Sequence, residues 1–231
     1  MNIEAPSSAH GDVAFRSYRP SDLTVCGRIA KEAFPYGRGS ERENSSKWTM
    51  EGYIESSLLY STWSEVACVG DEVVGFLFGR IEKTWKGRNR FRPLITELAM
   101  TARFLLRDPL MLARSLGLMW NVWITEAKLA EHRPESDAEI ELLIVDSRHR
   151  GKGIGKQLVD RFLGAAKNAG ARVATLYTED LQSNYRFYES YGFKRVATFY
   201  DDVTSYFAGK PSTAIIYALD LKRSEAPERP R

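Results

Sequence analysis

Residues 138–178 contain the pattern that most restricts how this chain can fold: an apolar strand, a glycine-rich turn, an amphipathic helix and a second strand. The first strand is expected over Ala138–Asp146, the helix over Gly155–Asn168 and the second strand over Arg172–Thr178. A strand–helix–strand unit places its two strands parallel in one sheet. The sequence therefore predicts an α/β fold with a parallel strand pair.

Other segments add antiparallel strands and further helices. Strand-like runs over Glu65–Val69 and Val73–Ile81 flank a Gly-Asp-Glu turn, which is typical of a hairpin. Strands are also expected over 13–18, 193–200 and 214–221, and helices over 20–34, 47–60 and 184–190. We expect one domain over residues 1–231, with a mixed sheet of six to seven strands, helices on both faces and a flexible tail over 222–231.

Residues 84–133 form an insertion between the third and fourth strands. Apolar residues follow the helical period on both sides of Pro109, so two helices are expected. The second, over Leu110–Ala130, is apolar on most sides and needs cover from the core, a partner subunit or a ligand. A role in acceptor binding or in a homodimer contact is expected for this insertion.

Composition excludes several classes of protein. A formal charge of +3 is too small for a dedicated nucleic-acid binder. The two cysteines, Cys26 and Cys68, lie in apolar runs without neighbouring histidines, which excludes a zinc site and a disulfide framework, so no metal is expected. No long uncharged apolar stretch or secretion signal is present, so a cytoplasmic protein that does not bind membranes is expected.

The turn within the strand–helix–strand unit is rich in groups that bind anions. It reads Arg150, Gly151, Lys152, Gly153, Ile154, Gly155, Lys156. Glycines let successive backbone N–H groups approach an anion, and the helix that begins there adds free N–H groups and its dipole. The spacing fits neither a Walker loop nor a GxGxxG dinucleotide fingerprint. The turn therefore predicts a pyrophosphate cradle of another kind.

Two blocks of the chain resemble the GNAT superfamily of N-acetyltransferases. Arg150, Gly153 and Gly155 satisfy its central motif of Arg or Gln, two residues, Gly, one residue, and Gly or Ala. The run from Tyr185 to Phe193 is similar to the aromatic block that the family carries after its fifth strand. Together the blocks span about residues 138–200, and the order of the earlier elements agrees. The resemblance implies a GNAT-like mixed sheet and acetyl-CoA as cosubstrate.

The resemblance also implies where acetyl-CoA binds. In the family, the strand before the turn splays from its neighbour and pairs with the pantetheine arm, which implies roles for Leu143, Ile144 and Val145. The pyrophosphate would meet the N–H groups between Gly151 and Lys156. Asn184, four residues before Tyr188, matches a coenzyme-binding position of one common family variant.

Catalytic roles follow from the same resemblance. Tyr188 matches the tyrosine that donates a proton to the departing thiolate in many members. Glu139 and Glu141 alternate along their strand, so both are expected on the face of Leu143 and Val145, where either could take a proton from the incoming ammonium. An oxyanion donor is expected among the backbone N–H groups near Leu143 or Ile144.

The favoured function is transfer of an acetyl group from acetyl-CoA to a primary amine of a small molecule or peptide by direct attack. Two other classes stay open: a non-catalytic regulatory module that binds acyl-CoA, and a transferase that uses the turn for ATP or NAD. The sequence does not identify the acceptor. Aromatic residues that could line its pocket are Trp48, Tyr53, Trp85, Trp120, Trp123 and Tyr200.

Overall fold

The computed structural model describes residues 12–34, 43–84, 111–181 and 185–222, without the side chains of 43–49 and 111–119. The first expected insertion helix, the greater part of the expected tail and Asn184 lie outside these residues. Seven strands form one sheet in the order β1-β2-β3-β4-β5-β7-β6. They are β1 Val13–Ser17, β2 Trp63–Val69, β3 Glu72–Ile81, β4 Ala138–Val145, β5 Val173–Glu179, β6 Lys194–Tyr200 and β7 Thr213–Asp220.

The expected mixed sheet is confirmed. Its only parallel pair among the described strands is β4–β5, at the centre of the sheet. The other neighbours are antiparallel. The β2–β3 hairpin turns at Gly70, whose φ of 58° lies in the region that favours glycine. The local patterns thus predicted both the strand pairing at the hairpin and the parallel pair at the centre.

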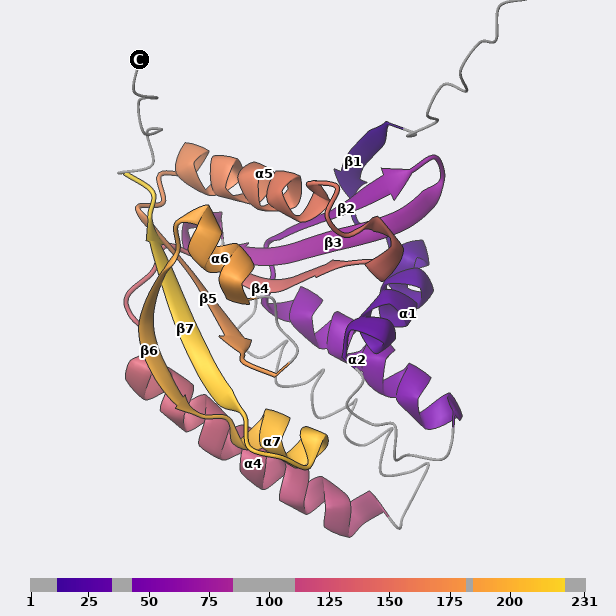
Figure 1. Cartoon of the computed structure of the whole chain (residues 1–231), viewed down its shortest axis with the longest axis vertical. Coiled ribbons are helices and arrows are strands. Elements are labelled where there is room, and N and C mark those ends of the chain that lie inside the picture. The colour runs from indigo at the N-terminus through magenta and orange to yellow at the C-terminus, as the bar shows by residue number, and fades with distance from the viewer. Residues whose placement is uncertain (1–11, 35–42, 85–110, 182–184, 223–231) are drawn as a thin grey trace, which may run out of the picture.

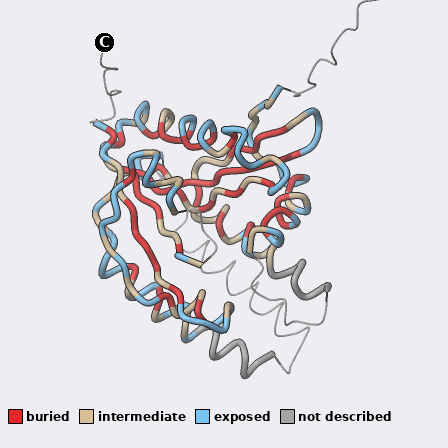
Figure 2. Tube along the Cα trace, viewed as in Figure 1, coloured by how far each residue is buried: buried red, intermediate tan, exposed pale blue. Residues whose placement is uncertain are grey.

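Helices cover both faces of the sheet (Figure 1). α5 (Ile154–Asn168) packs over β2, β3 and β4, and α6 (Tyr185–Tyr191) contributes aromatic side chains to the same core. α1 (Leu23–Ala33) and α2 (Glu43–Tyr60) pack on the opposite face, against β3 and β4. The burial map follows this layering, because the central strands are buried while α4, β6 and the outer side of α5 carry many exposed positions (Figure 2).

The second insertion helix is present as α4 (Met111–His132), between β3 and β4 in the chain. It packs against α7 (Asp202–Ala208), a helix that the sequence analysis missed. The signal for α7 was present, since the Asp201 side chain caps its first turn by accepting from Thr204 N and Gly209 ends it at a φ of 66°. Trp120 and Trp123 of α4 are 61% and 62% exposed. The core of the chain does not cover these two side chains, so their cover by a partner subunit or a ligand stays a prediction.

A β-bulge in β4 changes which side chains face which core. The register with β3 shifts between Phe78 and Gly79, which pair with Leu142 and Ile140, so Glu141 is the extra residue. Ile140 consequently lies in the core beneath α5, while Leu142 lies in the core beside α1 and α2. Gly79 permits this close packing, because a Cβ there would lie 2.4 Å from the Phe162 ring. The bulge decides where the acidic side chains of β4 point.

Candidate active site

The glycine turn has the backbone shape that an anion cradle requires. Gly151 and Gly153 have φ values of 75° and 78°, a region that side chains other than glycine rarely adopt. Gly153 is the N-cap of α5, so the N–H groups of the first helical turn have no acceptor within the helix. Gly155 needs no unusual φ, and its Cα lies against Val145 and Phe187. The expected cradle at 151–156 is thus locally consistent with anion binding.

The end of β4 beside this turn is open toward β5. The parallel pairing of the two strands ends at Ile140 with Leu176, so 141–145 have no β5 partner. Asp146 N donates to Val74 O, which makes Val145–Gly75 a non-hydrogen-bonded pair of the antiparallel ladder. By alternation, the N–H and C=O groups of Leu143 and Val145 point away from β3, while those of Ile144 point toward it. The backbone N–H and C=O groups of Leu143 and the N–H group of Val145 therefore face the side on which an extended ligand could pair with β4.

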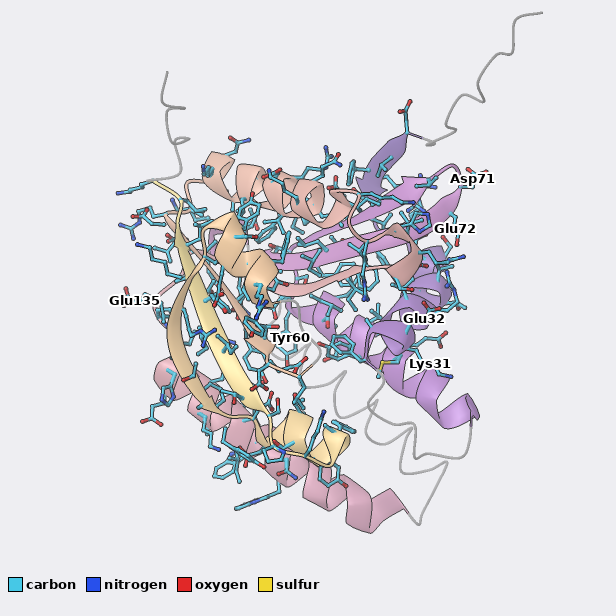
Figure 3. All side chains as sticks on the ribbon, viewed as in Figure 1. Lys31, Glu32, Tyr60, Asp71, Glu72 and Glu135 are labelled. Carbon is cyan, nitrogen blue, oxygen red and sulfur yellow. The ribbon has the colours of Figure 1, made fainter. Side chains whose placement is uncertain are left out.

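The basic side chains around the turn are engaged to different degrees. Arg150 Nε donates to Val145 O at 3.0 Å, which ties the turn to the strand end. Lys156 Nζ lies 2.8 Å from Asp160 Oδ2 and over the ring of Tyr191. Arg148 is held by Asp146 and by Glu72. Glu72 is the first residue of β3 and lies beside Asp71 of the β2–β3 turn (Figure 3). Lys152 is exposed. Backbone groups rather than free cations dominate the cradle.

Asp146 anchors the cradle to the rest of the fold. Its side chain is fully buried, caps the short helix Ser147–His149 by accepting from Arg148 N, and pairs with the Arg148 guanidinium. These contacts hold the pKa of its carboxyl far below the usual range. Arg28 of α1 approaches the same carboxylate at 3.6 Å. The cradle therefore starts from a fixed point that joins β4 to α1.

Tyr188 lies in a cluster of aromatic rings on the α5 side of the sheet. Its ring packs against Phe187, Phe193 and Tyr217. Burial, with a further contribution from Tyr53, raises the pKa of its hydroxyl well above the usual value. The phenol therefore keeps its proton at neutral pH, which a proton donor requires.

Glu139 and Glu141 share one face of β4, and it is not the expected face. Both carboxylates contact Arg80 of β3, on the side of α1 and α2, whereas Leu143 and Val145 pack against the core beneath α5. The expectation failed because strict alternation does not hold across the bulge at Glu141. The acidic pair and the coenzyme-facing residues are thus on opposite faces of one strand.

The two carboxylates have different surroundings. Glu139 pairs with Arg80 and, at 3.1 Å, with Arg133, which follows α4. Glu141 Oε1 lies 3.3 Å from Arg80 Nη1, and no donor among the described residues makes a hydrogen bond to it. Burial, followed by the charge of Glu139, raises the pKa of Glu141 to about 8. Sequence reasoning missed Arg80 and Arg133, which carry no local motif.

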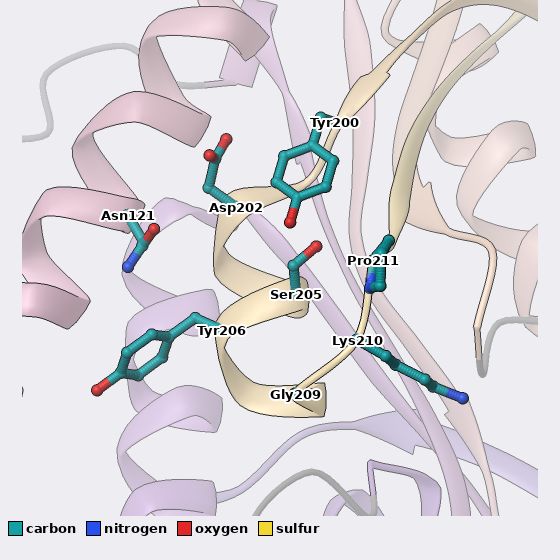
Figure 4. Close-up of a pocket in the computed structure, with 8 residues that line it drawn as sticks. All are labelled: Asn121, Tyr200, Asp202, Ser205, Tyr206, Gly209, Lys210 and Pro211. Carbon is teal, nitrogen blue, oxygen red and sulfur yellow. The ribbon is translucent and has the colours of Figure 1, made fainter.

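A pocket of about 360 Å³ lies between α4 and α7 (Figure 4). It is lined by Asn121, Tyr200, Asp202, Ser205, Tyr206, Gly209, Lys210 and Pro211. None of these is a candidate catalytic or coenzyme residue, so the pocket does not itself identify the acceptor site. Of the expected aromatic lining, Tyr200 lies here and Tyr53 near Glu141 and Tyr188, while the Trp48 side chain and Trp85 lie outside the described residues.

The part of the chain that the structure describes has no helix both long and apolar enough to cross a membrane. It also has no group of three or more His, Cys, Asp or Glu side chains placed to hold a metal ion.

Comparisons with known proteins find one family model and solved structures that resemble this chain. Residues 120–195 match the family model described as "Acetyltransferase (GNAT) domain". No curated protein matches the sequence. The crystal structure of Ard1 from Thermoplasma volcanium is similar, with 18% identity, a TM-score of 0.52 and coverage of 90% of this chain and 97% of that chain.

Two further solved structures share the fold. The ribosomal-protein-S18-alanine N-acetyltransferase from Escherichia coli has 13% identity and a TM-score of 0.51, with coverage of 95% and 99% of the two chains. The yncA structure from Salmonella typhimurium, with its cofactor acetyl-CoA, has 16% identity and a TM-score of 0.50, with coverage of 94% and 99%. The family model thus matches the part of the chain that runs from α4 to β6, and the likeness to these solved structures shows a shared fold.

Proposed function

We propose that the protein transfers the acetyl group of acetyl-CoA to a primary amine of a small molecule or peptide by direct attack. The observation that carries this proposal is the opening of β4 from β5 after Ile140, immediately before the glycine turn. An extended arm can pair with Leu143 and Val145 while its diphosphate meets the first N–H groups of α5. Acetyl-CoA has this shape and supplies the acetyl thioester.

Glu141 and Tyr188 are the candidate proton acceptor and proton donor, and both lie close enough to Tyr53 to interact with it electrostatically. Glu141 takes a proton from the acceptor ammonium, and the neutral nitrogen forms a C–N bond to the acetyl carbon as the C–S bond breaks. The Tyr188 hydroxyl protonates the departing sulfur and regains a proton that the nitrogen loses. Glu141 then releases its proton to solvent. The Leu143 N–H, which points away from β3, is the candidate donor to the carbonyl oxygen.

Charge favours an acceptor that arrives as an ammonium ion. Glu126 of α4 and Tyr53 of α2 lie close enough to Glu141 for their charges to interact with it. A buried carboxylate with a raised pKa accepts a proton near neutral pH more readily than an ordinary carboxylate. The proposed acceptor side is therefore formed by α2, α4 and the bulged part of β4.

The test combines turnover with binding. Thiol release from acetyl-CoA is measured with a panel of primary amines, first for the unchanged protein and then for Glu141→Gln and Tyr188→Phe. Each substitution is expected to lower kcat by roughly 10²- to 10⁴-fold. Calorimetry is expected to show unchanged affinity for acetyl-CoA, and Tyr206→Phe, on an exposed tyrosine of α7, is the matched control.

The competing functions give different outcomes. Binding of acetyl-CoA without thiol release from any amine would favour the regulatory module. Binding of ATP or NAD without binding of acetyl-CoA would favour a nucleotide-dependent transferase.

A further inference from the structure

Four charged side chains form a buried cluster on the α1/α2 side of the sheet. Arg80 of β3 lies between Glu139 and Glu141, and Arg133, which follows α4, approaches Glu139 from the other side. The side chains of Glu139, Arg80 and Glu141 are 5%, 18% and 20% exposed. Buried charges in such a cluster interact more strongly than exposed ones, because less water screens them.

The two carboxylates of the cluster have different numbers of close arginine partners. Glu139 is satisfied by two guanidinium groups from two different elements. Glu141 has one arginine at 3.3 Å, which is also shared with Glu139 and with Glu82 at 2.7 Å. Because Glu141 lies beside a second carboxylate and shares its one close arginine, its protonated form is favoured.

We propose that Glu139 is a positioning residue, clamped by Arg80 and Arg133, and that its fixed charge sets the proton affinity of Glu141. This inference rests on the proposed function, because it assigns Glu141 alone as the base. It also gives the end of the insertion a role in proton transfer, since Arg133 reaches the cluster from the end of α4.

The charged groups that face Glu141 have opposite effects on its protonation. Glu139 on β4 and Glu126 on α4 favour the protonated form of Glu141. Arg80 on β3 and Arg133 at the end of α4 favour its ionised form. Tyr53 on α2 faces it as a neutral phenol at physiological pH. Removal of an acidic neighbour and removal of a basic neighbour must therefore move the titration of Glu141 in opposite directions.

The experiment follows kcat against pH at saturating acetyl-CoA and amine, with the same amine for every variant. Glu139→Gln is expected to move the acidic midpoint down by about one pH unit, which raises the fraction of maximal kcat at pH 6 about tenfold. Arg133→Met, at a side chain 34% exposed, is expected to move the midpoint upward. Arg80→Lys keeps the positive charge, so its acidic midpoint is expected to stay near that of the unchanged protein.

Controls separate this inference from the proposed function. Glu82→Gln removes an exposed partner of Arg80 and is expected to leave the midpoint in place. Calorimetry with acetyl-CoA checks that each variant still binds the cosubstrate. Loss of activity in Glu139→Gln at every pH, or a midpoint that moves the same way in Glu139→Gln and Arg133→Met, would overturn the positioning role. Full activity of Glu141→Gln would overturn the assignment of Glu141 as the base, whereas the absence of thiol release by the unchanged protein with every amine would overturn the proposed function.

Discussion

The end of β4 at Val145 and its bulged end at Glu141 are formed by different kinds of chemical groups. The end at Val145 leads into a cradle made of backbone N–H groups and two glycines with positive φ, all within a short stretch of chain. The other end, at the bulge, brings together charged and phenolic side chains from β3, β4, α2 and α4. The cradle thus depends on backbone shape, whereas the bulged end depends on the balance of buried charges.

The contribution of the bulged end to kcat should depend strongly on pH. Because the pKa of Glu141 is raised to about 8, its carboxyl is protonated and inactive as a base below that pH. We expect kcat to be about a hundredfold lower at pH 6 than on the plateau above pH 8 to 9. The raised pKa of Tyr188 predicts that this plateau extends past the ordinary range of tyrosine.

The measurement is thiol release across the pH range at saturating substrates. A kcat that changes little between pH 6 and pH 9 would contradict a base with the titration expected of Glu141. The affinity for acetyl-CoA should change far less across this range, since the cradle is formed by backbone N–H groups, which do not titrate there.

The cradle end should be sensitive to backbone strain. Gly153→Val places a β-branched residue at a φ of 78°, a strain of about 1–3 kcal/mol that displaces the first N–H groups of α5. We expect the Kd for acetyl-CoA, measured by calorimetry, to rise roughly tenfold. Gly164→Ala in the same helix is the control, because an added Cβ there meets nothing within 4 Å. Equal affinities for the two variants would argue against the cradle.

The stability of the fold should be sensitive to side-chain volume added at the bulge. Gly79→Ala would put a Cβ 2.4 Å from the Phe162 ring and 2.9 Å from the Glu139 carbonyl oxygen. We expect a loss of about 1–3 kcal/mol in the free energy of unfolding, measured with urea. Gly52→Ala in α2 has open space and should be neutral or stabilising. A Gly79→Ala variant with an unchanged free energy of unfolding would show that β3 and β4 can separate at the bulge without losing stability.

Sequence reasoning succeeded where the determinants are local. The glycines of the turn, the alternation in β2 and β3, and the period of α5 each depend on neighbouring residues, so the hairpin and the parallel strand pair could be predicted. The face of Glu139 and Glu141 could not, because it depends on an extra residue opposite Gly79 of another strand. The partnership of Arg80 and Arg133 with Glu139 likewise joins positions far apart in the chain.

The smallest expected effect tests whether the cradle relies on side-chain charge. Lys156 follows the last glycine, yet Asp160 and the Tyr191 ring hold its ammonium group, so Lys156→Ala should change the Kd for acetyl-CoA by less than about threefold. Lys152→Ala, at an exposed position beside the two glycines, is the matched comparison. Calorimetry at two salt concentrations measures both. If Lys156→Ala weakened binding tenfold and removed its salt dependence, a cation would dominate the cradle, and the contrast between the two ends of β4 would not hold.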